Sequence, residues 1–221
     1  MKLLAIETAT HACSAALWVD GQRLDRTQVA PRQHSALVLA MVDELLVDAS
    51  LSLGNLDAIA FGQGPGSFMG VRLAVGIAQG LAFGAELPVI PVSTLQALAQ
   101  VAYQAKSISS VIAGWDARMN GIYWGAYTLD EAGIMQSVKA DALNEPNEIT
   151  LPAEHEWLLA GNAWDVYREK LDEKILACSM MTDIYPQASA VVEIGANLFS
   201  QGKVTSVEQA EPVYLRTKVT S

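Results

Sequence analysis

The residues whose types and spacing could do chemistry follow three short apolar runs, where strands are expected to end. Hydroxyls and one acid follow the first run, a glycine-rich loop follows the run at 56–61, and an acid and a base follow the run at 110–114. Loop N–H groups beside a helix N-terminus bind phosphate, and carboxylates at such turns can hold a metal ion. The candidate residues for a phosphate or nucleotide are Thr8, Thr10, Gly64, Gly66, Ser67 and Asp116.

The glycine-rich loop supports two interpretations. No Gly-Lys-Ser/Thr follows it, and Ser67 stands where a dinucleotide-binding fingerprint has its third glycine. A tight strand-to-helix turn that needs a positive φ explains the same glycines. Likewise, Thr8, Thr10 and Asp116 could simply satisfy N–H groups of their turns. The residues alone leave both interpretations open.

Residues for a metal site are scarce. His34 precedes a predicted helix, but the position four residues on, where a second ligand on the same face would stand, is Val38. His155 lies between two acids and is expected on the surface. Cys13 and Cys178 are too far apart for a metal-knuckle spacing and too few for a disulfide framework. We therefore expect no metal site and a reduced, cytoplasmic compartment.

Charge is scarce and unevenly distributed along the 221 residues. Lys and Arg number 14 and Asp and Glu 24, so the formal net charge is -10, and charged residues make up only 17%. A chain of this charge is repelled by a phosphate backbone, which argues against a stand-alone nucleic-acid binder. The segment 130–173 holds eleven acids against three bases and is expected to be solvated surface, whereas 33–105 holds only six charges. The apolar run at 73–85 is too short to span a bilayer and predicts a buried helix.

The order of apolar runs and turn residues predicts two related α/β lobes. In the first half it predicts strands at 3–6, 13–19, 22–29, 56–61 and 88–92, with helices at 36–47 (capped by Ser35), 68–83 and 94–105 (opened by a capping box at Ser93). The second half follows with strands at 110–114, 122–128 and 157–160 and a final helix at 188–200. Asp20-Gly21 predicts a tight hairpin between the second and third strands.

Two predicted helices carry unusual surfaces. Apolar residues surround most of the helix at 36–47, so it is either wholly internal or has one face against a partner. The helix at 68–83 has glycines at a spacing of four, Gly76, Gly80 and Gly84, which leave a stripe without side chains. Tight packing on the helix's own sheet is the favoured explanation of that stripe, and a binding role is the other.

The run DAIAFGQGPGSFMGVR at 57–72 resembles the signature of the TsaB (YeaZ) family. Further matching runs at 3–10, 33–35, 91–95, 116–119 and 211–216 extend the resemblance over nearly the whole chain. Two positions depart from the family pattern, since Met69 stands where Thr is more usual and Glu7 where Asp is common. Both departures concern positions that phosphate or magnesium chemistry would use.

That family is the small bacterial paralogue of the TsaD (Gcp) proteins, in the superfamily of actin, sugar kinases and heat-shock chaperone ATPases. The resemblance therefore implies an actin-like, RNase H-like two-lobe α/β fold. Its N-terminal lobe would span 1–106 and carry the partner-binding helices. A smaller C-terminal lobe would span 107–221, with a last helix able to pack back on the first lobe.

The resemblance also implies a function in making threonylcarbamoyladenosine. TsaD, with TsaB and the ATPase TsaE, transfers threonylcarbamoyl from threonylcarbamoyl-AMP to N6 of the adenosine 3′ to the anticodon, in tRNAs that read codons starting with A. The chain would be a non-catalytic scaffold or activator with no cofactor beyond weak nucleotide binding. It would pair with TsaD, act with TsaE, form a homodimer when alone, meet tRNA only through the complex and contact no membrane.

Two other activities compete with this expectation. The first is an active ATP-binding, ATP-hydrolysing or phosphotransfer enzyme of the same superfamily, and the second, a glycoprotease, is disfavoured because no nucleophile motif is present. The family's dimer interface is similar to a bundle of N-lobe helices from both subunits. The interface candidates carried over from this resemblance are Leu37, Val38, Met41, Leu45, Gly76 and Gly80.

Overall fold

The structure is a computed structural model that describes residues 1–152 and 156–216. The expected surface position of His155 therefore lies outside the described residues. The strands are β1 (Lys2–Glu7), β2 (Ala12–Val19), β3 (Gln22–Val29), β4 (Ala58–Gly62), β5 (Val89–Val92), β6 (Ser110–Asp116), β7 (Ile122–Leu129), β8 (Met135–Asn144), β9 (Leu158–Ala160) and β10 (Ser179–Met181). The helices are α1 (His34–Asp48), α2 (Phe68–Ala85), α3 (Thr94–Lys106), α4 (Ala163–Val166), α5 (Glu173–Leu176) and α6 (Ala188–Ser200).

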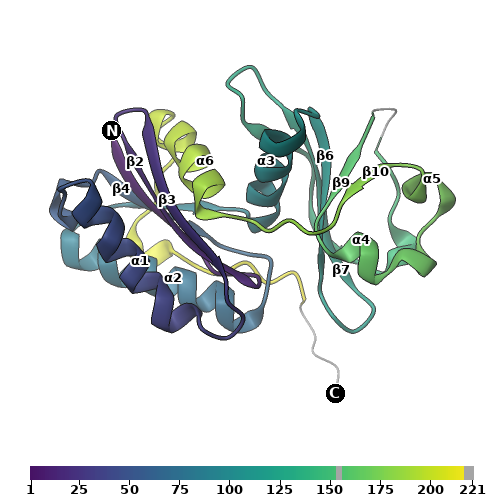
Figure 1. Cartoon of the computed structure of the whole chain (residues 1–221), viewed down its shortest axis with the longest axis horizontal. Helices are drawn as coiled ribbons and strands as arrows, with labels where there is room; N and C mark the ends of the chain where they lie inside the picture. Colours follow the sequence, from purple (N-terminus) through teal and green to yellow (C-terminus); the bar gives the residue numbers. More distant parts are fainter. Residues whose placement is uncertain (153–155, 217–221) are drawn as a thin grey trace.

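The first sheet has the strand order β3-β2-β1-β4-β5. Strands β1, β2 and β3 pair antiparallel, whereas β4 and β5 run parallel to β1. The predicted hairpin is confirmed, because Asp20 and Gly21 have φ values of 49° and 93° and join β2 to β3. Helices α1 and α2 cover one face of this sheet and α6 covers the other (Figure 1).

The second sheet repeats the pattern of the first. Its order is β10-β9-β6-β7-β8, with an antiparallel β6-β7-β8 meander and with β9 and β10 parallel to β6. Leu95 and Leu98 of α3 pack on one face, and Trp164 of α4 and Ile175 of α5 pack on the other. The predicted two-lobe α/β architecture is confirmed, and each lobe is built on the same five-strand plan.

The expected boundary between the lobes, after residue 106, differs from the way in which the buried cores divide the chain. Helix α3 packs on the second sheet, so it belongs to the core of the C-terminal lobe. Helix α6, from near the end of the chain, packs on β1, β2 and β4 of the first sheet. The two helices lie side by side between the sheets (Figure 1), where Glu193 of α6 accepts hydrogen bonds from Gln100 and Gln104 of α3.

The structure of helix α1 differs from the sequence prediction in two respects. It begins at His34, so Ser35 lies within its first turn instead of capping it, and the N-cap residue Gln33 makes no capping hydrogen bond through its side chain. Its apolar residues also divide between faces. Three of the interface candidates face the lobe's own core because the helix packs on β2, and they are not available to a partner: Val38, Met41 and Leu45. Leu37 is half-buried.

Helix α2 is not the buried helix that its composition predicted. Phe83 is 74% exposed, and a side chain added at Gly76 or Gly80 would meet no atom within 4 Å. The favoured explanation of the glycine stripe, packing on the sheet, is therefore wrong, because the helix turns the stripe to solvent. By length and composition α2 is the one helix among the described residues that could cross a membrane, but its other face packs on the first sheet.

The turn into α3 is partly as predicted. The Ser93 hydroxyl accepts hydrogen bonds from the N–H groups of Leu95 and Gln96, so Ser93 is the N-cap. The reciprocal half of the capping box is wrong, because the Gln96 side chain donates instead to the carbonyl of Met135 at 2.8 Å. This bond ties the start of α3 to β8 in the C-terminal lobe.

Candidate functional site

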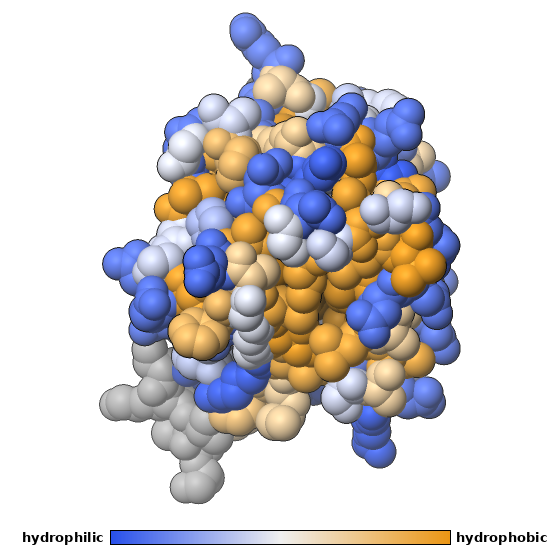
Figure 2. All heavy atoms as spheres, turned by 90° about the vertical axis from the view of Figure 1, so that its left-hand side faces the viewer, coloured by the Kyte–Doolittle hydropathy of each residue, from blue (hydrophilic) through white to orange (hydrophobic). Residues whose placement is uncertain are grey.

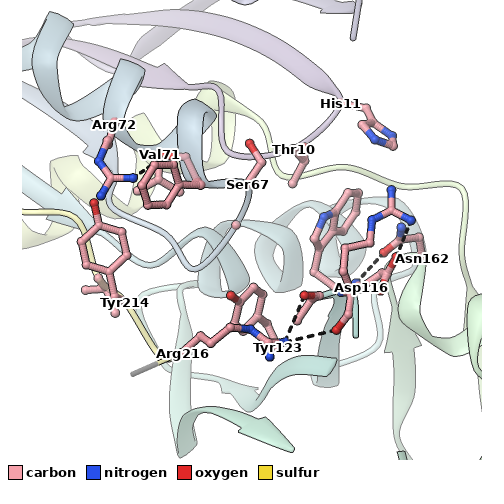
Figure 3. Close-up of a pocket in the computed structure, with 16 residues that line it drawn as sticks. Thr10, His11, Ser67, Val71, Arg72, Asp116, Tyr123, Asn162, Tyr214 and Arg216 are labelled. Carbon is pink, nitrogen blue, oxygen red and sulfur yellow. Dashed lines mark hydrogen bonds and ion pairs between the residues drawn. The ribbon is translucent and has the colours of Figure 1, made fainter. Parts of the chain in front are cut away.

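A cavity of about 670 Å³ lies between the two lobes, where β1 and β6 end. The turn after β1, the loop before α2 with the first turns of that helix, the end of β6 with the turn after it, and the C-terminal segment near residue 214 line it, together with Tyr123 of β7 and Asn162. Figure 3 shows Thr10 and Ser67 on one side of this cavity and Asp116 on the other. The structure thus brings together part of the predicted phosphate set: Thr10, Gly66, Ser67 and Asp116.

Glu7, the acid that ends β1, does not line this cavity. Its carboxylate accepts hydrogen bonds from the Ala9 N–H at 2.6 Å and from the Thr94 hydroxyl at 3.0 Å. It passes over Gly62, where a Cβ atom would lie 1.9 Å from Glu7 Oε2. Complete burial raises the pKa of Glu7 to about 7, although these hydrogen bonds act in the opposite direction. The carboxyl group therefore holds β1 and β4 of the first sheet against the start of α3.

The glycine-rich loop is a tight strand-to-helix turn packed against the end of β1. Gly64 has a φ of 98°, and its N–H donates to the Thr94 hydroxyl. The Ser67 N–H donates to the Ala9 carbonyl at 2.7 Å, and a Cβ atom at Gly66 would lie 2.6 Å from that carbonyl. The N–H groups of Gly64 and Ser67 are therefore occupied, so they are not free for phosphate.

The two threonines after β1 differ in what they contact. Thr8 is buried and donates a hydrogen bond from Oγ1 to the carbonyl of Gly70 at 2.7 Å, so it connects the turn to α2. Among the described residues, no turn N–H donates to this hydroxyl. Thr10 is 4% exposed, lines the cavity, and has an Oγ1 atom without a hydrogen-bond partner among the described residues. Of the two, Thr10 is the hydroxyl that could serve a ligand.

Asp116, at the end of β6, is held by its own turn. Its carboxylate accepts a hydrogen bond from the Arg118 N–H at 2.8 Å and another from the Tyr167 hydroxyl at 2.7 Å. The Arg118 side chain adds an ion pair at 3.1 Å. Burial, followed by the bond to Asp116, raises the pKa of Tyr167 to about 12. The interpretation that Asp116 satisfies a turn N–H is therefore confirmed.

Basic residues gather at this cavity although the whole chain is acidic. Arg72, Arg118 and Arg216 line it, and Asp116 is the one acid among the described lining residues. The Arg72 guanidinium lies 3.2 Å from the centre of the Phe68 ring and 4.8 Å from that of Tyr214. Figure 3 shows Arg72 next to Tyr214. Aromatic faces attract such cations.

The C-terminal segment closes one side of the cavity. The Val213 N–H donates to the Gln63 carbonyl at 2.8 Å, and the Arg216 guanidinium donates to the carbonyls of Ala117 and Arg118 at 3.2 and 3.1 Å. The segment therefore connects the loop before α2 to the turn after β6. Arg72 and Arg216 were missing from the predicted site, although the scarcity of basic residues could have drawn attention to them.

Within residues 1–152 and 156–216, no group of three or more His, Cys, Asp or Glu side chains lies in a geometry that could hold a metal ion. Gly64 and Thr8 of the predicted set do not line the interlobe cavity.

Comparisons with known proteins agree with this architecture. The family model for TsaD, tRNA N6-adenosine threonylcarbamoyltransferase, matches residues 27–220. The tRNA threonylcarbamoyladenosine biosynthesis protein TsaB of Escherichia coli strain K12 is 42% identical, over 99% of this chain and 96% of that protein.

Solved structures extend the agreement to the fold. YeaZ from Pseudomonas aeruginosa superposes with a TM-score of 0.92 at 40% identity, covering 97% of this chain and 99% of that one. Component A of (R)-2-hydroxyglutaryl-CoA dehydratase from Acidaminococcus fermentans, at 10% identity and a TM-score of 0.50, covers 91% of this chain and 98% of its own and is similar in fold alone. The fold is actin-like, and the chain belongs to the TsaB family of tRNA threonylcarbamoyladenosine biosynthesis proteins.

Proposed function

We propose that this chain is a non-catalytic partner subunit that acts with TsaD and TsaE in the transfer of threonylcarbamoyl to N6 of the adenosine 3′ to the tRNA anticodon. The observation that carries the proposal is an exposed apolar face on the N-terminal lobe. On α2 this face follows helical spacing and consists of Met69, Leu73, Gly76, Gly80 and Phe83. Figure 2 shows a broad hydrophobic area on this end of the molecule.

The chemistry of the α2 face suits a helix from another subunit. Gly76 and Gly80 have nothing within 4 Å of an added Cβ atom, so a second backbone can approach closely. Met69 and Phe83 flank them and are 73% and 74% exposed. On the neighbouring α1, Leu39 and Val47 are also exposed. A partner that covers this face in an interface of standard size would bury about 800 Å² on each side.

The contacts of the two acids that end β1 and β6, Glu7 and Asp116, support a subunit without its own catalytic step. The Glu7 carboxyl is enclosed by Ala9, Thr94 and Gly62, and the Asp116 carboxylate is engaged by Arg118 and Tyr167. A metal-assisted phosphoryl transfer needs such acids free to hold the ion. The net charge of -10 favours contact with tRNA through a partner, and the two free cysteines fit a cytoplasmic setting.

The test is reconstitution of the modification reaction from purified chain, TsaD, TsaE and unmodified tRNA, with threonylcarbamoyl-AMP as the donor of the group and with ATP. We expect product only when all three proteins are present, and no product from this chain alone. Gly80→Arg and Phe83→Asp should each reduce co-elution with TsaD and product formation together, because each places a charge on the apolar face. Val138→Asp, which changes an exposed apolar residue on β8 of the other lobe, is the matched control.

Two results would contradict the proposal. The first is threonylcarbamoyl transfer, or turnover of ATP with magnesium, by this chain alone. The second is normal complex formation by both α2 variants, which would place the partner on another surface.

A further inference from the structure

The edge strands of the two sheets differ in how well they are protected from pairing with another chain. Strand β5 contains Pro91, which has no N–H to donate to a neighbouring strand, and Thr205 already pairs with Val89 on it. Strand β8 has register shifts against β7, and β10 has only three residues. In the part of the chain that the structure describes, β3 is the one edge strand with none of these features.

Strand β3 is a long and regular edge. Its residues, 22–29, pair one to one with β2, contain no proline and form no bulge. The two residues that flank a two-residue hairpin loop form a hydrogen-bonded pair, and such pairs alternate along an antiparallel ladder. The N–H and C=O groups of Arg23, Asp25 and Thr27 therefore point away from β2.

These outward backbone groups are open to a further strand. Within residues 1–152 and 156–216, the one hydrogen bond made to them is from Arg26 Nη1 to the Asp25 carbonyl, at 3.0 Å. A carbonyl oxygen has two acceptor sites, so the Asp25 carbonyl can accept a second hydrogen bond. The edge therefore offers a row of donors and acceptors that only water satisfies.

The sequence of β3 is complementary to itself. In an antiparallel pair of β3 strands centred on Leu24, this residue lies opposite its own copy, and Arg23 of each chain lies opposite Asp25 of the other. The same register sets outward-pointing backbone groups opposite one another, so about four backbone hydrogen bonds form. Centring the pair on Arg23 or on Asp25 would instead set like charges opposite each other, which is unfavourable.

The side chains at this edge are accessible to a second chain. Arg23 and Asp25 lie on the same face of the sheet, where they form an ion pair at 3.4 Å with side chains 35% and 36% exposed. Leu24 points to the opposite face and is 37% exposed. On that face Arg26 is already paired with two acids of α1, so it adds no unpaired positive charge.

We propose that β3 pairs edge to edge with β3 of a second copy of this chain, antiparallel and centred on Leu24. The two first sheets then form one continuous sheet across a two-fold axis. This contact is separate from the partner face on α2, because α1 packs on β2 and β3 whereas α2 packs on β1, β4 and β5. Both surfaces can be occupied at once, so the pairing does not depend on the proposed function.

Cysteine cross-linking tests the register. Leu24 would lie opposite its own copy with about 4.5 Å between the Cα atoms, so Leu24→Cys should form a covalent dimer on mild oxidation. Gln22 is exposed on the same face, but the register offsets it from its copy by four residues, about 13 Å, which a disulfide cannot span. Gln22→Cys is therefore the matched control. Both variants also carry Cys178→Ser, because Cys178 is partly exposed.

Sedimentation equilibrium tests the charge complementarity. The chain carries Phe83→Asp, which removes association through α2, and is measured in 0.15 M salt, where the Debye length of about 8 Å screens the repulsion between two chains of net charge -10. Arg23→Asp should weaken dimerisation at least about tenfold, because two attractive pairs become repulsive. Adding Asp25→Arg should restore the dimer. Arg168→Asp, at an exposed arginine of the other lobe, is the matched control.

Three results would overturn the proposal. The first is cross-linking of Gln22→Cys equal to that of Leu24→Cys, and the second is the absence of a covalent dimer from Leu24→Cys. The third is a Phe83→Asp chain that stays monomeric, or that dimerises equally well with and without Arg23→Asp.

Discussion

Glu7→Gln should remove a pH dependence from the stability of the chain. The Glu7 carboxyl is buried, and burial raises its pKa from 4.5 to about 7. Between these two pH values the folded chain keeps a proton that the unfolded chain has released, so the free energy of unfolding falls as pH rises. The stabilising contribution of the protonated group is complete below pH 4.5 and is lost as pH rises through 7.

The size of the effect follows from the shift. One pKa unit corresponds to about 1.4 kcal/mol, so ionisation of Glu7 should cost about 3 kcal/mol of stability between pH 4.5 and pH 8. Glutamine is neutral at every pH and keeps an oxygen for the Ala9 N–H. The variant should therefore be more stable than the parent chain at pH 8, and the difference should shrink toward pH 5.

The assay is urea unfolding followed by tryptophan fluorescence at pH values from 5 to 8. Glu131→Gln, at an exposed position, is the control for losing one formal charge. Parallel stability curves for Glu7→Gln and the parent chain would refute the reasoning, because they would mean that the Glu7 carboxyl has the same proton affinity in the folded and unfolded chains.

Three further substitutions probe the close contacts that hold the lobes. Gly62→Ala should destabilise the chain by about 2–3 kcal/mol in urea unfolding, because its Cβ atom would lie 1.9 Å from the buried Glu7 carboxylate. Gly114→Ala should cost about 1–3 kcal/mol and shift tryptophan emission, because its Cβ atom would lie 2.4 Å from the Trp164 ring. Arg216→Ala should cost about 1 kcal/mol and speed proteolysis near the chain end, since it removes two hydrogen bonds to carbonyls of the turn after β6. For each variant, an unfolding curve identical to that of the parent chain would contradict the expectation.

Elements with strong local signals were predictable from the sequence. The Asp20-Gly21 hairpin and the final helix at 188–200 are where the apolar pattern and turn residues placed them. Strand β8 was missed because it is largely exposed and polar, so no apolar run marks it. Strand β10 was missed because it is short and, unlike the equally short β9, is not fully buried: Ser179 is exposed, and Met180 and Met181 are half-buried.

The sequence could not predict which side of each helix faces solvent. Nor could it predict which of the site residues have hydrogen-bond partners within the chain. Composition alone could not tell that Val38 faces the sheet whereas Gly76 faces solvent, since that depends on the angle at which each helix meets the strands. The gathering of Arg72 and Arg216 at one cavity depends on a contact between segments far apart in sequence. Thr8 and Thr10 are the same residue type two positions apart, so the sequence does not distinguish them. In the structure the Gly70 carbonyl accepts a hydrogen bond from Thr8 Oγ1, whereas Thr10 Oγ1 has no partner among the described residues.

The position of α6 sets an order for folding on the ribosome. Leu3, Ala5 and Ala60 of the first sheet pack against α6, which is synthesised after nearly the whole of the C-terminal lobe. Domains commonly fold in the order in which they leave the ribosome. Here the lobe that is translated first keeps one apolar sheet face uncovered until residues 188–200 emerge, so it is the last to be completed. A nascent chain that stalls before α6 would expose that face to chaperones.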